Sequence, residues 1–331
     1  MLGIRLAICL ILSTLISISV GEKAGRKEFL GVLEQYDIHN DLTTFRGLVK
    51  LLVPNNKAFD KLGGRKALEE HKKRDIQALL RYHILAEPIV AALLPVGELT
   101  VPTLLDNTAY AKVTGGQQML IAKYVDGEVV FISGSGTRGS VQGPGGEDVL
   151  FGNGTIQVID SVMQIPKSLE ATAWDDYPEQ LTSFVEALKT TDDQLVAVCR
   201  YHIVPRRVLH TWELADGMAV ETLQSNRALT FTKHDNTIYA NSAKLLAPLA
   251  DILLSTGLVH VISNVLNPED PDARPDPTNR NGVQPDVFPK TSTGTTYRPP
   301  RPTKEADSAA RMTGAIGFGL GLGLAMLGFG F

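Results

Sequence analysis

The stretch LLRYHIL at 79–85 has a counterpart, VCRYHIV, at 198–204. Both copies spell Arg-Tyr-His-Ile, and the two tyrosines, Tyr82 and Tyr201, are 119 residues apart. Four identical residues can match by chance, so the flanking sequence has to decide whether the chain uses one structural unit twice.

Three further pairs of segments match in the same order along the chain, which chance does not explain. The first pair predicts a helix, the second predicts two alternating strands around a turn, and the third predicts a buried strand. The pairs are LTTFRGLVK (42–50) with LTSFVEALK (181–189), QQMLIAKYVDGEVVFIS (117–133) with RALTFTKHDNTIYANS (227–242), and GTIQVIDSV (154–162) with GLVHVISNV (257–265). The sequence therefore predicts a tandem repeat.

The second copy is incomplete. The upstream pair is offset by 139 residues and the tyrosine pair by 119, so the second copy is 20 residues shorter between these points. The segment without a counterpart, LLVPNNKAFDKLGGRKALEE at 51–70, reads as a strand, a turn and the start of a helix. The second copy thus lacks secondary structure, and not only a loop.

Three motifs of the first copy resemble the signatures of fasciclin-like domains. LLVPNNKAFDKL at 51–62 resembles the first signature, RYHIL at 81–85 the central Tyr-His motif, and NGTIQVIDSVMQIP at 153–166 the closing signature. The resemblance implies an α+β fold, a β-sandwich-like wedge decorated with helices, used twice. We expect one module at 22–166 and a second at 170–268 that lacks the first-signature strand and helix.

The residues of these signatures suit structural roles. We expect Phe59 to insert into the core, and Asn55 and Asn56 after Pro54 suit the turn and the N-cap that begin a helix. Apolar residues on both faces of 156–162 predict a strand buried on two sides. The structural signature comprises Pro54, Asn55, Asn56, Phe59, Ile156, Val158, Ile159 and Asp160.

His83 and His202 have two interpretations. Catalysis would need a partner motif, and the sequence has no Gly-x-Ser-x-Gly elbow, no His-Glu-x-x-His and no acidic metal loop. GSGTRG at 134–139 spells Gly-x-Gly-x-x-Gly, but no amphipathic helix is predicted after it, so we expect a flexible loop and not a dinucleotide site. A buried histidine that donates to a backbone carbonyl is the favoured interpretation. We therefore expect no catalytic residue, cofactor or metal.

The resemblance keeps a binding role open for the same motif. In the fasciclin-like family the Tyr-His neighbourhood has been proposed as an adhesion surface. This implies a candidate adhesion motif made of Tyr82, His83, Tyr201 and His202.

The N-terminus has the layout of a secretory signal. Arg5 precedes the uncharged stretch 6–20, and the small residues Ser19 and Gly21 suit cleavage after Gly21. The stretch is shorter than the roughly 20 apolar residues of a membrane span. We therefore expect a signal peptide at 1–21 and a secreted chain, in which the remaining Cys199 can form no internal disulfide.

The C-terminus predicts a lipid anchor. Small residues around Ser308 precede an uncharged tail at 315–331, as in glycosylphosphatidylinositol (GPI) signals, whose tail is removed. The spacer at 311–314 is shorter than the roughly 8–12 polar residues usual there. A membrane helix is the alternative, but the six glycines of the tail weaken helix formation. We therefore predict attachment at Ser308 and a GPI-attachment signal at 308–331.

Two further features concern the surface of the protein. Residues 269–307 are rich in proline, lack periodic apolar residues and cluster threonines near 291–296, which predicts a disordered Pro/Thr-rich stalk. Asn153 begins the sequon Asn-Gly-Thr in a turn before a strand, so we expect N-glycosylation there.

These features predict a non-catalytic adhesion glycoprotein of the cell surface, extracellular matrix or cell wall, held to the membrane by its lipid anchor. Expected partners are a matrix or wall protein or glycan, or a second copy of the protein. The net charge of −4 creates no field that would recruit nucleic acid. A secreted hydrolase stays open if His83, His210 or His234 lies in a cleft near a carboxylate and a nucleophile. A small-molecule carrier would need a large apolar pocket between the modules.

Overall fold

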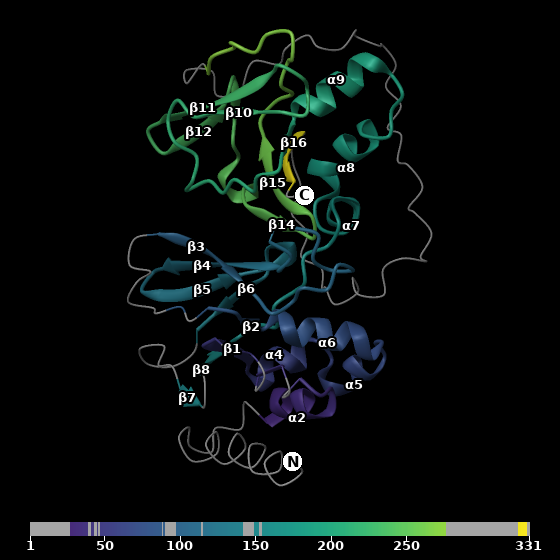
Figure 1. Ribbon diagram of the computed structural model, residues 1–331, viewed down its shortest axis with the longest axis vertical. Helices are drawn as coiled ribbons and strands as arrows, with labels where there is room; N and C mark the ends of the chain where they lie inside the picture. The colour runs from purple at the N-terminus through teal and green to yellow at the C-terminus, as the bar shows by residue number, and fades with distance from the viewer. Residues whose placement is uncertain are drawn as a thin grey trace. The chain divides into compact units, whose positions relative to one another are not determined.

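The computed structural model describes residues 27–38, 41–42, 45, 47–87, 89, 97–113, 115–141, 149–151, 154–275 and 324–329. They form two compact units (Figure 1), which we call module one and module two. Module one contains the chain up to Ile165 except 112–115, and module two contains 112–115 and the chain from Pro166 on. The predicted signal peptide, the glycan site Asn153, the anchor residue Ser308 and the stalk beyond residue 275 lie outside the described residues.

Module one combines helices with two sheets, as an α+β fold requires. The sheets have the strand orders β2-β1-β8-β7 and β3-β4-β5-β6. Its described helices are α2 (Lys27–Gln35), α4 (Asn56–Lys61), α5 (Gly64–Glu69) and α6 (Lys73–Tyr82), and its described strands are β1 (Val49–Pro54), β2 (Ile84–Leu85), β3 (Glu98–Pro102), β4 (Met119–Val125), β5 (Glu128–Ile132), β6 (Arg138–Ser140), β7 (Val149–Phe151) and β8 (Gly154–Ile159).

Strand β1 lies inside the first sheet of module one. All six residues of its sequence VKLLVP are buried, as is typical of a strand covered on both faces. It pairs in parallel with β8, from Val49 opposite Gly154 to Pro54 opposite Ile159, and antiparallel with β2. The first and closing signatures of the sequence are therefore neighbouring strands.

The second sheet of module one is antiparallel. Strands β4 and β5 meet at the predicted turn, where Asp126 and Gly127 have φ of 50° and 90°, as a tight hairpin requires. The segment 134–139, expected to be a flexible loop, instead forms a 3-10 turn at Gly134–Gly136 and continues into β6. Because β6 pairs with β5, this segment belongs to the fold.

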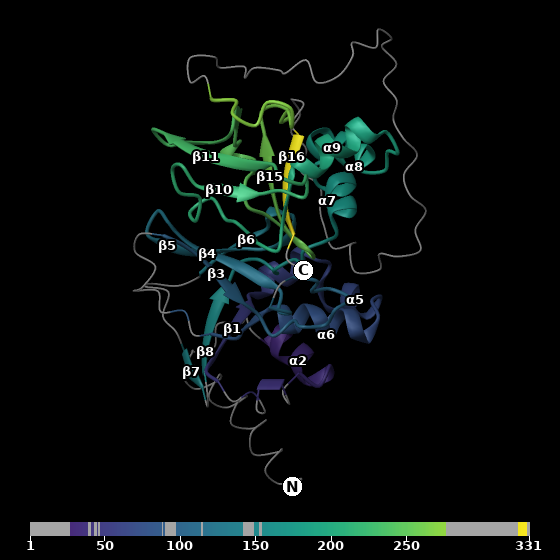
Figure 2. The same cartoon turned by 45° about the horizontal axis from the view of Figure 1, so that its top comes forward.

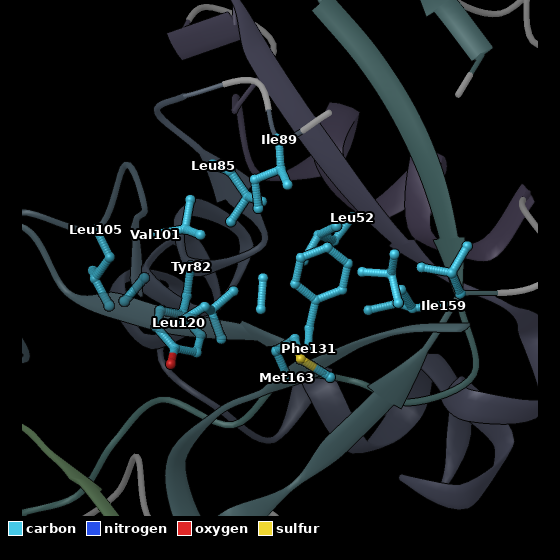
Figure 3. Packing of buried hydrophobic residues seen from close by; sticks show 14 residues of the cluster. Leu52, Tyr82, Leu85, Ile89, Val101, Leu105, Leu120, Phe131, Ile159 and Met163 are labelled. Carbon is cyan, nitrogen blue, oxygen red and sulfur yellow. The ribbon is translucent and has the colours of Figure 1, made fainter. Parts of the chain in front are cut away.

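The core of module one brings together side chains from both sheets and from helix α6. Leu52 comes from β1, Tyr82 from α6, Phe131 from β5 and Ile159 from β8, and all four are almost completely buried. Figure 3 shows them gathered with Met163, which follows β8. The sequence motifs therefore meet in one apolar cluster.

Module two repeats this plan in fewer residues. Its sheets have the strand orders β10-β11-β12-β13 and β14-β15-β16-β9. Its described helices are α7 (Leu169–Asp175), α8 (Pro178–Ala187) and α9 (Asp193–Tyr201), and its described strands are β9 (Ile203–Pro205), β10 (Ala219–Glu221), β11 (Ala228–His234), β12 (Thr237–Ala240), β13 (Ala243–Lys244), β14 (Ile252–Leu254), β15 (Gly257–Ile262) and β16 (Leu324–Phe329).

Module two lacks counterparts of β1, α4 and α5, as predicted, because α9 is the next element after α8. The place of β1 in the sheet is taken by β16, which lies between β15 and β9. Figure 2 shows β16 beside β15. Strand β16 runs antiparallel to β15 over six residue pairs and parallel to β9 over three. Its direction is the reverse of β1, which runs parallel to its own closing strand. The segment predicted to be an anchor signal thus contains a strand.

The predicted match between the two upstream segments is wrong. LTSFVEAL lies within and just after α8, but LTTFRGLVK leaves a helical turn at 41–42 and enters β1. The counterpart of Phe184 is Phe29 of α2, because each ring is tilted against the histidine of its own module, at centroid distances of 5.5 and 5.8 Å. Phe29 and Phe184 are 155 residues apart, so module two is 36 residues shorter ahead of its tyrosine, and not 20.

Residues 269–275, assigned to the stalk from the sequence, form turns at the end of module two. The N–H of Asp270 donates to the carbonyl of Asn267, and the N–H of Ala273 donates to that of Asp270. The carboxylate of Glu269 lies 3.9 Å from the Arg227 guanidinium. The described fold of module two therefore continues to residue 275.

Candidate functional site

The histidine of the first Tyr-His motif joins two distant segments of module one. His83 is the C-cap of α6, and its Nδ1 donates to the carbonyl of Leu79 at 2.8 Å. Its Nε2 accepts from the N–H of Met163 at 3.0 Å. One neutral imidazole therefore pairs with a backbone carbonyl at the end of α6 and with a backbone N–H after β8. These two bonds assign its proton to Nδ1.

Module two repeats this arrangement with different residues. Nδ1 of His202 donates to the carbonyl of Val198 at 2.8 Å, and Nε2 accepts from the N–H of Leu266 at 3.0 Å. Both histidines are 0% exposed. Burial lowers the pKa of each to about 4, against a smaller opposite effect of the bonded backbone carbonyl, so both are neutral at pH 7.

The tyrosines of the motif are also interior. The Tyr82 hydroxyl donates to the carbonyl of Met119 at 2.9 Å, and that of Tyr201 donates to the carbonyl of Ala228 at 3.1 Å. Asn241 donates to the Tyr201 hydroxyl at 2.7 Å. Burial raises the pKa of both phenols. A backbone hydrogen bond from Gly134 partly opposes this at Tyr82, and the bond from Asn241 partly opposes it at Tyr201. Both side chains are 0% exposed, so a partner cannot reach them while the modules stay folded.

The first signature builds the end of β1 and the start of α4. Asn55 is the N-cap, and its side chain accepts from the N–H of Ala58 at 2.9 Å, while Asn56 is the first helical residue and Pro54 the last of β1. Phe59 is 3% exposed and its ring centroid lies 5.9 Å from that of Phe29. The first signature therefore forms the junction between β1 and α4, with Phe59 in the core.

The closing signature forms strand β8 and the turn after it. Ile156 and Ile159 are buried, and Val158 is half-buried. The carboxylate of Asp160 accepts from the N–H of Ser140 at 2.8 Å, which ties the end of β8 to the end of β6. These residues hold the fold together.

The comparisons with known proteins agree with this geometry. The family model of the fasciclin domain matches residues 24–166 and 170–268. The chain belongs to the fasciclin-domain family. Because the two matched segments coincide with the two Tyr-His motifs and their closing strands, it is a tandem fasciclin-domain protein.

Two curated relatives are fungal. A "Fasciclin-like arabinogalactan protein" of Arthroderma benhamiae is 26% identical over 296 residues, which cover 78% of this chain and 68% of the relative. "Fasciclin-like arabinogalactan protein elcF" of Phaeosphaeria nodorum is 24% identical over 267 residues, 71% of this chain and 82% of the relative. Among solved structures, the FAS1 domain pair of the insect cell adhesion molecule Fasciclin I aligns with a TM-score of 0.38 and 15% identity, over 76% of this chain and all of that chain.

The second fasciclin module contains a polar cluster that sequence analysis did not assemble. The Asp251 carboxylate accepts from the N–H of Thr211 at 3.0 Å and from its hydroxyl at 2.5 Å, and lies 3.4 Å from Nδ1 of His210. The N–H of Asp251 donates to Nδ1 of His260 at 3.2 Å, and Nε2 of His260 lies 2.8 Å from the carbonyl of Leu209. Sequence analysis singled out only His210 of this cluster, because its partners Asp251 and His260 are distant in the chain and no motif links them.

Burial and charge decide what this cluster can do. Burial alone would raise the pKa of Asp251, but the neighbouring His210 imidazole, the charge of His260 and the hydrogen bonds from Thr211 lower it below its usual value. Burial lowers the pKa of His260, although Asp251 opposes this. The Thr211 hydroxyl donates to the carboxylate and not to an imidazole, so it is not activated as a nucleophile. The cluster therefore resembles a structural network more than a hydrolase site.

Other site types gain little support from the described residues. These residues include no group of three or more His, Cys, Asp or Glu placed to hold a metal ion. A pocket of about 200 Å³ in module two is lined by Asn241, Leu266, Asp270 and Arg274 among others, and is smaller than the roughly 300–1,000 Å³ of small-molecule sites. In the part of the chain that the structure describes, no helix is both long enough and apolar enough to cross a membrane.

Proposed function

We propose that this protein is a non-catalytic adhesion glycoprotein of the cell surface or cell wall, whose two fasciclin modules bind a wall glycan or protein. The main support is the position of the Tyr-His motifs. The residues that identify the family are buried and satisfied by backbone groups in both modules, so they maintain the fold and leave the outer surfaces to bind partners. The two fungal relatives carry the name arabinogalactan protein, which favours a wall glycan as partner.

The proposed location follows from the sequence at both ends of the chain. Residues 1–21 would direct secretion, and a GPI anchor at Ser308 would hold the modules on a Pro/Thr-rich stalk outside the membrane. A glycan on Asn153 and sugars on the stalk threonines would make the protein a glycoprotein. Attachment at Ser308 would remove the segment that forms β16.

A binding experiment tests the function. The chain from residue 22 is labelled and added to isolated fungal cell walls, and to the same walls after protease or glycanase treatment. We expect saturable binding that survives protease and falls after glycanase treatment. Loss after protease alone would assign a protein partner, and binding no stronger than that of heat-unfolded protein would contradict the adhesion function.

The anchor needs a separate test. Phosphatidylinositol-specific phospholipase C should release the protein from intact cells, and a chain ending at Ala306 should appear in the medium. Failure to release it, under conditions that free a known anchored protein, would support a retained tail.

A further inference from the structure

The inner position of the β9–β15 sheet is filled by a distant segment of the chain. In module one the equivalent position, between β2 and β8, is filled by β1, which precedes both of its neighbours in the chain. In module two the chain between α8 and α9 supplies no such strand, and β16 pairs with both neighbours instead. The same inner position of the sheet is thus occupied in the two modules by strands from different parts of the chain.

The flanking strands need a partner at this position. All six residues of β15 are buried, and β14 pairs with only three of them, from Gly257 to Val259. Strand β16 pairs with all six, from Gly257 opposite Phe329 to Ile262 opposite Leu324. Without it, one whole edge of β15 and one of β9 would lose backbone partners, and unpaired buried backbone groups are costly.

We propose that the gap between β9 and β15 is a strand-binding site of module two, and that its occupant is the chain's own segment Leu324–Phe329. The ligand class is an extended, uncharged peptide, held by backbone hydrogen bonds on both edges. The occupant's sequence, LAMLGF, is a continuous uncharged run, as is typical of inner strands covered on both faces.

The connection permits this pairing. The 48 residues between Pro275 and Leu324 can span roughly 160 Å when fully extended, so the length of the connection allows the segment to enter the gap in either direction. A tethered strand also has an effective concentration on the order of millimolar, which disfavours a competing strand from another molecule. Removal of the tail at Ser308 would therefore open the site in the anchored form.

The first experiment compares two chains made without a signal in bacteria, where no transamidase removes the tail: residues 22–331 and residues 22–314. Hydrogen exchange is followed in peptides that cover β9 and β15. We expect amides of β15 to exchange about tenfold faster or more in the shortened chain, because opening then needs less than global unfolding. Equal exchange in the two chains would overturn the proposal.

In the second experiment, the deleted strand is supplied to the shortened chain as a separate peptide. The probe is a peptide of residues 322–331 with lysines added at its N-terminus for solubility, and the matched control carries Leu327→Pro, which removes a ladder donor. The probe should bind the shortened chain saturably and restore slow exchange in β15, and should not bind the 22–331 chain. Equal effects of probe and control would contradict a strand site.

A third measurement covers the case in which the shortened chain does not fold. In the 22–331 chain, with Cys199→Ala to remove the free thiol, the pair Val259→Cys and Leu327→Cys occupies opposite positions of β15 and β16. It should cross-link under mild oxidation, whereas Val259→Cys with Leu324→Cys, three residues out of register, should not. Cross-linking of both pairs alike, or of neither, would overturn the proposal. Phospholipase release of the cellular protein tests the anchor independently. The anchor and the strand-binding site can therefore each be refuted without the other.

Discussion

Nε2 of His83 accepts a hydrogen bond from the backbone N–H of Met163 at 3.0 Å, and this bond joins residues 80 positions apart in the chain. It connects the end of α6 to the segment that follows the closing strand β8. The bond from Leu266 to His202 does the same in module two. The Tyr-His and closing motifs therefore occur together because they are two ends of one contact.

Replacing these histidines should destabilise each module separately. His83→Phe keeps a ring of similar size but leaves the Leu79 carbonyl and the Met163 N–H buried without this partner. We expect a loss of about 2–4 kcal/mol in the free energy of unfolding of module one. Urea unfolding, followed by hydrogen exchange of module-one peptides, measures it. The control His234→Phe changes an exposed side chain and should cost less than about 0.5 kcal/mol.

The same histidine gives module two a defined pH dependence. The pKa of His202 is about 4 in the folded state, below the roughly 6.5 of an unfolded chain, so the unfolded state takes up the proton first as the pH falls. Its contribution to stability is therefore complete above about pH 6.5 and is lost as the pH falls toward about 4, for a total of about 3 kcal/mol.

Tryptophan fluorescence reads this effect in module two, because both tryptophans of the chain, Trp174 and Trp212, belong to it. Between about pH 6 and pH 5 the unfolding free energy of the parent should fall more steeply than that of His202→Phe, by about 1.2 kcal/mol over this pH unit. Contributions of His260 and the carboxylates are common to both proteins and cancel in the difference. Parallel slopes would show that His202 is not a buried neutral group.

Phe59 tests the first signature as a core element. Phe59→Ala removes a buried ring that packs near Phe29 and should lower the stability of module one by about 3–5 kcal/mol. Leu150→Ala, at a side chain that is 78% exposed, is the matched control and should change little. An unchanged urea midpoint for the Phe59 variant would contradict the core role.

Asp251 should act as a structural residue of module two. Asp251→Asn weakens the bonds from Thr211 and removes the charge beside His210 and His260, so we expect a loss of about 1.5–3 kcal/mol. The exposed Asp235→Asn serves as the control, and tryptophan fluorescence during urea unfolding is the readout. A variant as stable as the parent would leave the cluster available for a functional role.

The sequence predicted the parts of the fold that rest on local pattern. Both hairpins fall at the predicted turns, and both closing strands lie where their continuous apolar runs placed them. The loss of the first-signature strand and helix from module two was recognised, because the second copy has no segment like 51–62, although the deficit is 36 residues and not 20. The buried histidines were predicted from the absence of any catalytic partner motif, and the structure confirms that each donates to a backbone carbonyl.

Other parts of the fold could not be predicted because they depend on tertiary contacts. The match of 42–50 with 181–189 was wrong because it rested on the similar letters LTTF and LTSF. The true counterpart of Phe184 is Phe29, which is identified only by its contact with His83. Strand β16 gave no signal, because a glycine-rich apolar tail has the composition of an anchor signal and its partners lie more than 60 residues earlier. The Asp251 cluster likewise comes together only in the folded module.

The most direct test of the account is the wall binding of a protein that keeps its fold but loses the tyrosine hydroxyls of both motifs. Tyr82→Phe with Tyr201→Phe keeps both buried rings and removes the hydroxyl bonds, among them those to Met119, Ala228 and Asn241. If the motif serves the fold and the outer surfaces bind, the dissociation constant for isolated walls should stay within about twofold of the parent, with a loss of stability of about 1 kcal/mol per module. Binding weakened by about tenfold or more, with both modules still folded by hydrogen exchange, would show that the motif itself makes the adhesive contact.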